Sequence, residues 1–553
     1  MTTTSEPTTA GVLNPLGYPP HVDARAMAAR LDALEGKRVF VIDPRFDEGT
    51  NLLRPLMQWF AEQLPDVTIE YVELPGNYLG DFSELWGELA ERGDAAIIGV
   101  GHCSTCAPAV SQFAMALEGA HRLPTVSIHT TMFARLVKSV SRVGGMPGLR
   151  QVFVPHPVIG RSADELWGYL KGDDPLTGYP VLQEIIAGLS EPLDDQERTG
   201  MGFDRDTPTY VEPDSEENLH RLFEDSGWTD HLPIILPTEE RVQAMLQGTG
   251  HARDEVVGRM RPTHTREAWE YTVEKVAANA VMAGARPEYL PIILALAASG
   301  VSARGSSTAS MNNMAVVNGP IRHEIGMNSG LGAMGPYNHA NATIGRAYGL
   351  LSQNLQGGSK PGLTYMGSQG NSLAYNSMCF AENEEASPWE PLHVSHGFDA
   401  GQSAVSVYRG GAYVSATLAV HPDSWQEHLR TMLLGMDPGM CAPTLLLDPL
   451  AAERFVALGG FDTKQSLIDW VREHALQRGE DYWNRQVVRN YIYPNATVGQ
   501  EPAAGRLAAG PDAMIEIFNP ESIGVVVVGG GTKPYWCVAG PRYMRTVSVD
   551  EWR

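Results

Sequence analysis

The chain has 553 residues, with 41 Lys plus Arg against 65 Asp plus Glu, and a formal net charge of −24. This negative field repels phosphate backbones and anionic membrane surfaces, so we expect neither nucleic acid nor a membrane as a partner. At roughly 150 residues per domain, the length predicts two to four domains. The hydrophobic fraction of 43% and the charged fraction of 19% are those of a globular protein, which excludes global disorder.

The apolar stretches are too short to cross a membrane. The longest, Tyr289–Ala298, contains Pro291 and falls far short of the roughly 20 residues that a spanning helix needs. Residues 1–17 are polar and lack the features of a secretory signal. Five cysteines are an odd and low number, which is typical of free thiols in a reducing compartment. We therefore expect a cytoplasmic protein.

Residues 37–190 alternate short apolar runs with segments of helical period. This alternation is typical of βαβ units and predicts a flavodoxin-like, doubly wound parallel sheet of five strands. The expected strands lie at Val39–Ile42, Val67–Val72, Ala95–Val100, Thr125–Ile128 and Gln151–Val154. The expected helices lie at Leu52–Gln63, at Phe82–Ala90, after Ala107 and at Phe133–Ser141. Residues 1–36 are expected to form an arm with a short helix near Ala24–Leu34.

Residues 191–230 are polar and aperiodic, which predicts a linker. Residues 231–553 alternate Gly- and Asn-rich loops with helices and strands, so we expect a larger C-terminal α/β domain. Its expected helices lie at Glu239–Gln247, Glu267–Ala283, Thr343–Asn354, Trp425–Leu434 and Lys464–His474. Its expected strands lie at Met314–Val317, Ala404–Tyr408, Thr444–Leu447 and Gly524–Val528.

Polar residues follow most of the expected strands of the first sheet, where ligands bind in doubly wound folds. They are Asp43 after the first strand, His102, Cys103 and Cys106 after the third, His129, Thr130 and Thr131 after the fourth, and His156 after the fifth. In a flavodoxin-like order the first, third and fourth strands are neighbours. We therefore expect Asp43, Cys103 and His129 to converge on one edge.

Cys103 and Cys106 form a Cys-x-x-Cys at the expected start of a helix near Ala107 or Pro108. A helix N-terminus lowers the pKa of a thiol, and a second thiol one turn further can attack a bond formed at the first. The pattern thus predicts a nucleophilic Cys103 and a resolving Cys106. Two alternatives stay open, namely buried structural thiols and half of a zinc site, although no second Cys-x-x-Cys completes such a site.

The three nearby histidines, His102, His129 and His156, are each better explained singly as hydrogen-bonded structural residues. Their shared position favours an acid or base role for at least one of them. Cys379, Cys441 and Cys537 are interpreted as buried or bystander thiols.

The run Gly99–Cys106 resembles the UGSC-type (seleno)protein family, in which a Sec-Gly-Ser-Cys motif follows the third strand of a flavodoxin-like domain. Cys103 occupies the selenocysteine position and Cys106 that of the last cysteine. Pro124–Val126, His129–Ala134 and Val154–Pro157 are also similar to this family, so the resemblance covers residues 37–160. A more distant similarity is to the substrate-activating subunits of glycine and betaine reductases.

This sequence departs from the family motif at two points. Ser104 and Thr105 replace Gly and Ser, and sulfur replaces selenium at Cys103, which makes a slower nucleophile and a poorer leaving group. The second half resembles the long domain that accompanies such modules, through Thr272–Gly284, Val317–Arg322 and Phe380–Trp389. There the resemblance implies architecture rather than chemistry.

A Gly/Asn-rich loop follows the expected strand at Met314–Val317. It contains a G-x-G-x-x-G within Gly326–Gly335, but outside a βαβ context this is a weak dinucleotide fingerprint. We interpret Asn318, Arg322 and the loop amides as a holder for an anionic group such as a carboxylate, with a simple turn as the alternative. Gly529–Lys533 lacks the Walker spacing and is interpreted as a turn.

The densest acidic and aromatic cluster comprises Glu382, Glu384, Glu385, Trp389 and His393. Carboxylates with a histidine can bind a divalent ion, but a solvated loop or an interface explains the cluster equally well. We therefore predict no metal site. The patterns identify no cofactor.

Together these patterns predict a cytosolic enzyme in which the Cys103 thiolate attacks a small, anionic substrate in thiol-dependent reductive chemistry, with Cys106 resolving the adduct. The expected catalytic residues are Cys103, Cys106, His129, His102 and Asp43, and the expected substrate-binding residues are Thr130, Thr131, His156, Asn318, Arg322, Glu382 and Glu384. One alternative is a lyase, hydratase or hydrolase with Cys103 as covalent nucleophile, and another is a binding or scaffold protein. A homo-oligomer is expected.

Overall fold

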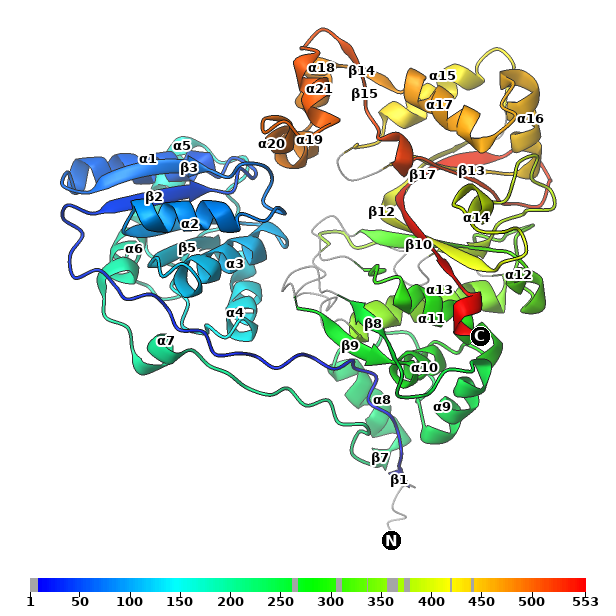
Figure 1. The fold of residues 1–553 in the computed structure, drawn as a ribbon, viewed down its shortest axis with the longest axis horizontal. Helices are drawn as coiled ribbons and strands as arrows, with labels where there is room; N and C mark the ends of the chain where they lie inside the picture. Colours follow the sequence, from blue (N-terminus) through cyan, green and yellow to red (C-terminus); the bar gives the residue numbers. More distant parts are fainter. Residues whose placement is uncertain are drawn as a thin grey trace, which may run out of the picture.

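The computed structural model describes residues 8–553 except 261–266, 305–310, 336, 356–366, 372–377, 418–419 and 439–441. Its side-chain detail also leaves out residue 312 and residues 411–419. Figure 1 shows two lobes, one built on the first sheet and one containing the rest of the chain from about residue 214.

The first lobe contains a parallel sheet of five strands in the order β3-β2-β4-β5-β6. This order is that of a flavodoxin-like sheet, so the predicted fold class is confirmed. The strands are β2 (Arg38–Asp43), β3 (Thr68–Glu73), β4 (Ala95–Gly101), β5 (Thr125–Thr130) and β6 (Gln151–Val154). Every residue of β4 and β5 is buried, as expected for central strands covered on both faces.

Helices cover both faces of this sheet (Figure 1). One face packs against α1 (Thr50–Gln63), α5 (Ala163–Lys171) and α6 (Val181–Ser190) around an aliphatic core. The other packs against α2 (Ser83–Arg92), α3 (Cys106–Gly119) and α4 (Ala134–Val143), where Trp86, Phe113 and Leu136 are buried. The second group includes the helix that begins at Cys106, so the thiol pair lies where β4 passes into α3.

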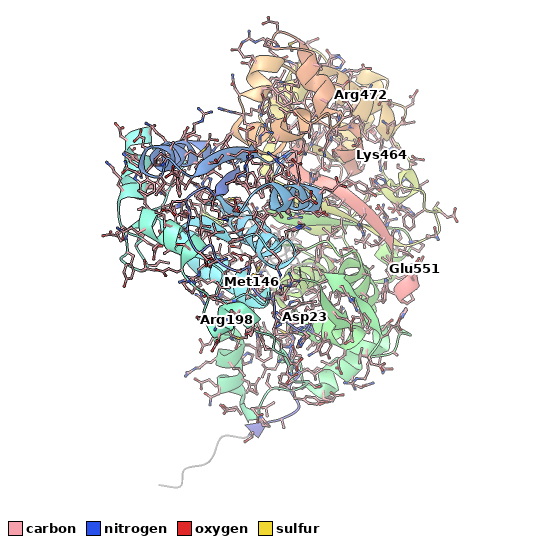
Figure 2. The ribbon with its side chains drawn as sticks, turned by 60° about the vertical axis from the view of Figure 1, so that its left-hand side comes forward. Asp23, Met146, Arg198, Lys464, Arg472 and Glu551 are labelled. Atoms are coloured by element: carbon pink, nitrogen blue, oxygen red, sulfur yellow. The ribbon has the colours of Figure 1, made fainter. Side chains whose placement is uncertain are left out.

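The N-terminal arm is extended, and the helix expected near Ala24–Leu34 is absent from the described structure. Its amides form hydrogen bonds to other segments instead of to a helix. Those of Arg25, Met27 and Leu31 donate to the carbonyls of Gly145, Glu197 and Leu189. The amides of Leu13 and Tyr18 likewise donate to Pro237 and Glu270 in the second lobe. Figure 2 shows Asp23 of the arm in the region of Met146 and Arg198. The arm therefore connects the two lobes.

The second lobe combines a helical layer with a mixed sheet of six strands in the order β11-β10-β12-β17-β13-β16. Its strands are β10 (Asn312–Asn318), β11 (Cys379–Ala381), β12 (Ala404–Thr417), β13 (Thr444–Leu447), β16 (Gly524–Val527) and β17 (Trp536–Ser548). The layer on one side contains α9 (Glu239–Met245), α10 (Val273–Met282), α11 (Leu290–Ala298) and α13 (His339–Asn354). The main helices in the outer part are α15 (Trp425–Leu434), α16 (Pro449–Gly459) and α17 (Lys464–His474).

Smaller elements complete the chain. They are the strand pairs β1 (Thr8–Thr9) with β7 (Asp214–Ser215), β8 (Val256–Met260) with β9 (Trp269–Thr272), and β14 (Leu476–Arg478) with β15 (Met514–Glu516), and the helices α7 (Asp195–Thr199), α8 (Glu216–Asp225), α12 (Ile321–Glu324), α14 (Leu392–Ser395), α18 (Gly479–Trp483), α19 (Gln486–Tyr491), α20 (Tyr493–Ala496) and α21 (Ala503–Ala508).

Two expectations for this region are wrong. The segment Glu267–Ala283 is not one helix, because Trp269–Thr272 pairs with β8 before α10 begins. The expected linker contains α8, which Ser215 caps and whose Leu219 and Phe223 are buried. Among the described residues, no helix is long and apolar enough to cross a bilayer.

Candidate active site at the Cys103–Cys106 pair

The two thiols are held by each other's backbone. The amide of Cys106 donates to Sγ of Cys103 at 3.0 Å, and the amide of Cys103 donates to Sγ of Cys106 at 3.1 Å. The amide of His102 also donates to Sγ of Cys106, at 3.3 Å. Both cysteines are buried and free of a disulfide. These contacts follow from the turn between β4 and α3, in which two amides of the turn, His102 and Cys103, and the first amide of the helix, Cys106, point at the sulfurs.

The two thiols differ in pKa because their environments differ. Burial raises the pKa of Cys103, but hydrogen bonds from the side chains and amides of Cys106 and Thr105 outweigh it and bring the pKa to about 7. Burial raises the pKa of Cys106 well above its ordinary value, and the neighbouring Cys103 adds to that shift. Near neutral pH Cys103 is therefore partly ionised to the thiolate, whereas Cys106 stays a thiol.

A line of hydroxyl groups runs from Cys103 to the second lobe. Sγ of Cys103 lies 3.3 Å from Oγ1 of Thr105, which lies 2.6 Å from the hydroxyl of Tyr78. The Tyr78 hydroxyl lies 2.8 Å from that of Tyr491, in α19. Burial raises the pKa of both tyrosines, so both hydroxyls stay protonated near neutral pH.

Neighbouring contacts fix α19 and α20 against the thiol lobe. Side chains of Gln486 and Asn490 donate to Oδ1 of Asp47. Oδ1 of Asn495 accepts the amide of Asn77 at 2.9 Å. The second lobe therefore contributes part of the wall around Cys103.

Sequence reasoning missed Thr105, Tyr78 and Tyr491. Tyr78 lies in the loop after β3, so the rule that ligand-binding residues follow the strands also points to it. Nothing in the sequence connects Tyr491 with Cys103, which lies almost 400 residues earlier, because only the packing of the two lobes brings them together.

His102, which precedes Cys103, and Asp43, at the end of β2, are both engaged in local contacts. Nε2 of His102 is 3.2 Å from the carbonyl of Phe46, and burial lowers the pKa of the ring. The carboxylate of Asp43 accepts hydrogen bonds from the Arg45 amide and from the hydroxyls of Thr50 and Tyr71. Asp43 thus stabilises the turn after β2. Catalytic roles for either residue stay predictions.

His129 is fully buried and lies beside Gly101, its neighbour across β4 and β5. Its Nε2 is 3.1 Å from Oγ of Ser127 and 3.3 Å from Oγ of Ser111. Burial lowers the pKa of His129 to about 3, so the ring is neutral near pH 7. These contacts explain His129 as a buried structural residue, and its role in proton transfer stays a prediction.

His129 makes a measurable prediction about acid stability. Unfolded His129 takes up a proton below about pH 6.5, whereas folded His129 does so only near pH 3. The unfolded state therefore binds more protons in this window, and stability falls as the pH falls. We expect His129 to remove about 2–3 kcal/mol of unfolding free energy between neutral pH and about pH 4.5. Urea titrations of wild type and H129Q across this range measure it, and equal pH dependences in the two proteins would contradict it.

The three predicted substrate-binding residues of the first lobe lie at the ends of β5 and β6. Oγ1 of Thr130 is buried and lies 3.1 Å from Nδ1 of His156, whose ring packs edge-on against Phe133. Thr131 begins the short 3₁₀ turn before α4 and is partly exposed. Thr130 and His156 are thus brought together at the carboxyl edge of the sheet.

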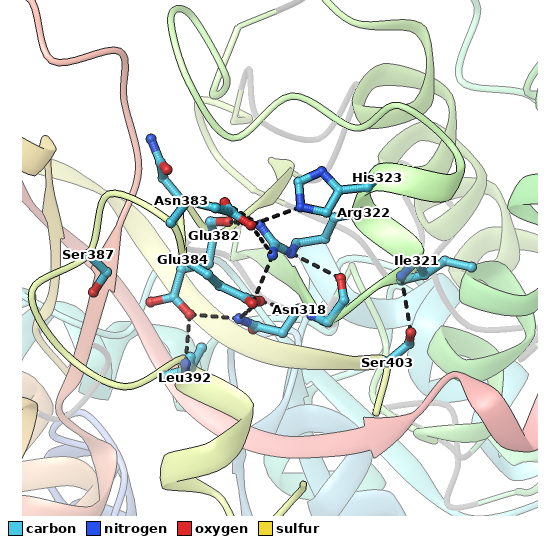
Figure 3. A network of polar contacts seen from close by, with 12 residues as sticks. Asn318, Ile321, Arg322, His323, Glu382, Asn383, Glu384, Ser387, Leu392 and Ser403 are labelled. Carbon is cyan, nitrogen blue, oxygen red and sulfur yellow. Dashed lines mark hydrogen bonds and ion pairs between the residues drawn. The ribbon is translucent and has the colours of Figure 1, made fainter. Parts of the chain in front are cut away.

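The predicted residues of the second lobe form a separate network (Figure 3). Nδ2 of Asn318 donates to Glu382 at 2.6 Å and to Glu384 at 2.9 Å. The guanidinium of Arg322 is paired with Glu384 at 2.8 Å and with Glu385 at 2.9 Å. All four predicted residues, Asn318, Arg322, Glu382 and Glu384, therefore lie together.

The charges of this network are neutralised from within. Lys464 of α17 donates to Oε1 of Glu382 at 2.6 Å, and the Leu392 amide donates to Oε2 of the same carboxylate. Arg322 is 3% exposed and is already paired with two carboxylates. The arrangement explains these residues as a structural ion-pair network, and their role in binding an anion stays a prediction. Among the described residues, no group of three or more His, Cys, Asp or Glu is arranged to hold a metal ion.

The fold and the site define a class, a flavodoxin-like α/β protein with a Cys-x-x-Cys at the N-terminus of the helix after its third strand in chain order. Within that class, residues 11–169 match the model of the UGSC family, which supports the predicted resemblance to this family. No curated protein and no solved structure matches the chain. The distant similarity to subunits of glycine and betaine reductases stays a prediction.

Proposed function

We propose that the protein is a thiol-dependent oxidoreductase in which Cys103 is the nucleophile and Cys106 the resolving thiol. The observation that carries the proposal is the pair of opposite environments within one turn. Sγ of Cys103 accepts the first amide of α3 and faces the Thr105 hydroxyl, while Cys106 is fully buried. Hydrogen bonds to the Cys103 thiolate stabilise it, whereas at Cys106 burial and the neighbouring Cys103 outweigh the two amides that donate to its sulfur and keep this thiol protonated.

The proposed reaction passes two electrons to the substrate. The Cys103 thiolate attacks an electrophilic atom of the substrate, and a group bound to that atom leaves with its electron pair. Cys106 then loses its proton and attacks Sγ of Cys103. The Cys103–Cys106 bond forms, the bond from Cys103 to the substrate breaks, and the substrate leaves with that electron pair and takes up a proton. An external dithiol reductant restores the two thiols.

The hydroxyl line has a supporting part in this proposal. Thr105, Tyr78 and Tyr491 keep their protons near neutral pH, so they can donate hydrogen bonds toward negative charge that develops at the sulfur. Tyr491 belongs to the second lobe, so thiol chemistry depends on both lobes being in contact. The substrate is expected to be a small molecule.

A second candidate keeps Cys103 as a covalent nucleophile without redox change, in a lyase, hydratase or hydrolase. The complete burial of Cys106 favours it, because a thiol with a raised pKa can serve as a hydrogen-bond donor alone. The two candidates differ in whether Cys106 ever bonds to Cys103.

Counting thiols by alkylation and mass spectrometry, before and after treatment with oxidised glutathione, separates the candidates. We expect two thiols to be lost together, at Cys103 and Cys106, and to return after dithiothreitol. In C106S this paired loss should disappear, whereas C379S, which removes another buried thiol, should behave as wild type. An unchanged thiol count under every oxidant would rule out the redox proposal and favour the non-redox nucleophile.

A further inference from the structure

Two arginines face each other across the second sheet. Arg409 of β12 is directly opposite Arg542 of β17, and Asn313 of β10 is the partner of Arg409 on the other side. Directly opposite residues of antiparallel strands point to the same face, so the three side chains form one row. Like charges in this arrangement destabilise a sheet unless a counter-ion lies between them.

The chain supplies no such counter-ion among its described residues. No ion pair or hydrogen bond of the described structure involves the guanidinium of Arg409 or Arg542, although this protein has 65 acidic residues. The internal segments outside the described residues contain no Asp or Glu, so they add no carboxylate either. Arg322, in contrast, is paired with two glutamates. The row also offers a polar group, because the buried Oδ1 of Asn313 has no partner in the described structure.

Arg542 lines a cavity of the second lobe that it shares with Tyr491, the last residue of the hydroxyl line from Cys103. This cavity has a volume of about 200 Å³ and is also lined by Tyr491, Asn495, Arg506 and Glu501. Arg506 is engaged with the carbonyl of Phe518 and the side chain of Asn519, and Glu501 accepts the amide of Gly505. Of the two arginines in this wall, Arg542 is therefore the one left for a ligand. Tyr491 joins this cavity to Cys103 through the hydroxyl line.

We infer that Arg409 and Arg542 bind an oxyanionic group, a carboxylate or a phosphate, of the molecule on which Cys103 acts. Guanidinium groups bind such planar or tetrahedral oxyanions through two parallel hydrogen bonds. In the absence of ligand the paired positive charges repel each other, and the anion removes that cost on binding. The inference rests on the proposed function only in assigning the anion to the substrate of Cys103; the anion site itself does not depend on thiol chemistry.

Thermal unfolding in inorganic phosphate, and separately in succinate, tests the site at constant ionic strength against sodium chloride. Wild type should show a saturable rise in Tm with at least one of these anions, because a ligand that binds only the folded state stabilises it. R542Q and R409Q should lose that rise. R54Q, which removes an exposed arginine of α1, should keep it. Because R542Q and R409Q each relieve a like-charge pair, neither should lower the Tm in chloride alone.

The outcomes distinguish this inference from the proposed function. No saturable rise in wild type with either anion, or an equal rise in R542Q, would overturn the anion site. Alkylation of Cys103 by neutral iodoacetamide is followed in the same samples. A phosphate-dependent or succinate-dependent rise that R542Q abolishes, together with an unreactive Cys103, would support the site and refute the thiol chemistry. A reactive Cys103 in a protein that neither anion stabilises would support the thiol chemistry and refute the anion site.

Discussion

G101A is expected to lower the free energy of unfolding by about 3 kcal/mol, the upper part of the range for overpacking a close-packed core. A Cβ at this position would overlap Nδ1 of His129 and lie 2.8 Å from Cα of Ala107. Neither neighbour can move easily, because His129 is fully buried and Ala107 belongs to the backbone of α3. Since Gly101 directly precedes the His102–Cys106 turn, any shift of α3 also displaces the thiols. Denaturation in guanidinium chloride, followed by circular dichroism, measures the loss.

G168A is the matched control for this variant. Gly168 lies in α5, is exposed, and a Cβ there would meet no atom within 4 Å. Alanine favours a helix over glycine by about 1 kcal/mol, so this change should leave stability unchanged or raise it. Equal unfolding midpoints for G101A and wild type would mean that Gly101 is not closely packed against His129.

C103S is expected to slow the alkylation of the folded protein by iodoacetamide at pH 7 by about 100-fold or more. Only Cys103, among the described cysteines, has a lowered pKa. Burial raises the pKa of Cys379 and of Cys537 to about 12, and that of Cys106 well above its usual value. Almost no thiolate should therefore remain when Cys103 is removed.

Cys441 lies outside the described residues, so C103S is compared with wild type in a C441S background. C379S in the same background is the control and should keep the full rate. A rate that C103S leaves unchanged would show that another thiol is the reactive one.

Much of the fold was predictable because local patterns determine it. The strands of the first sheet lie within one or two residues of the expected runs, since buried parallel strands are almost continuously apolar. The helices Trp425–Leu434 and Lys464–His474 lie where expected, because their apolar residues recur at helical spacing. The arm was predicted less well, since its amphipathic pattern packs as extended chain against other segments.

Only the part of the site formed by residues that are adjacent in the chain was predictable. Cys103, Cys106 and the following helix are adjacent in the chain, so the rule about strand ends located them. Tyr491 and the pair Arg409 and Arg542 depend on long-range packing and strand register, which no local pattern contains. The sequence predicted Arg322 as an anion-binding residue. The glutamates that pair with it are about 60 residues further along the chain, so no local pattern indicated those ion pairs.

The pH dependence of Cys103 alkylation tests the central claim most directly. Site-resolved mass spectrometry follows the reaction of Cys103 with iodoacetamide in the native protein from mildly acidic to alkaline pH. The stabilised thiolate predicts a rate that rises as the pH increases, with its midpoint near pH 7. A midpoint at or above the ordinary thiol pKa of about 8.5, or no reaction of Cys103 in the folded protein, would contradict the account.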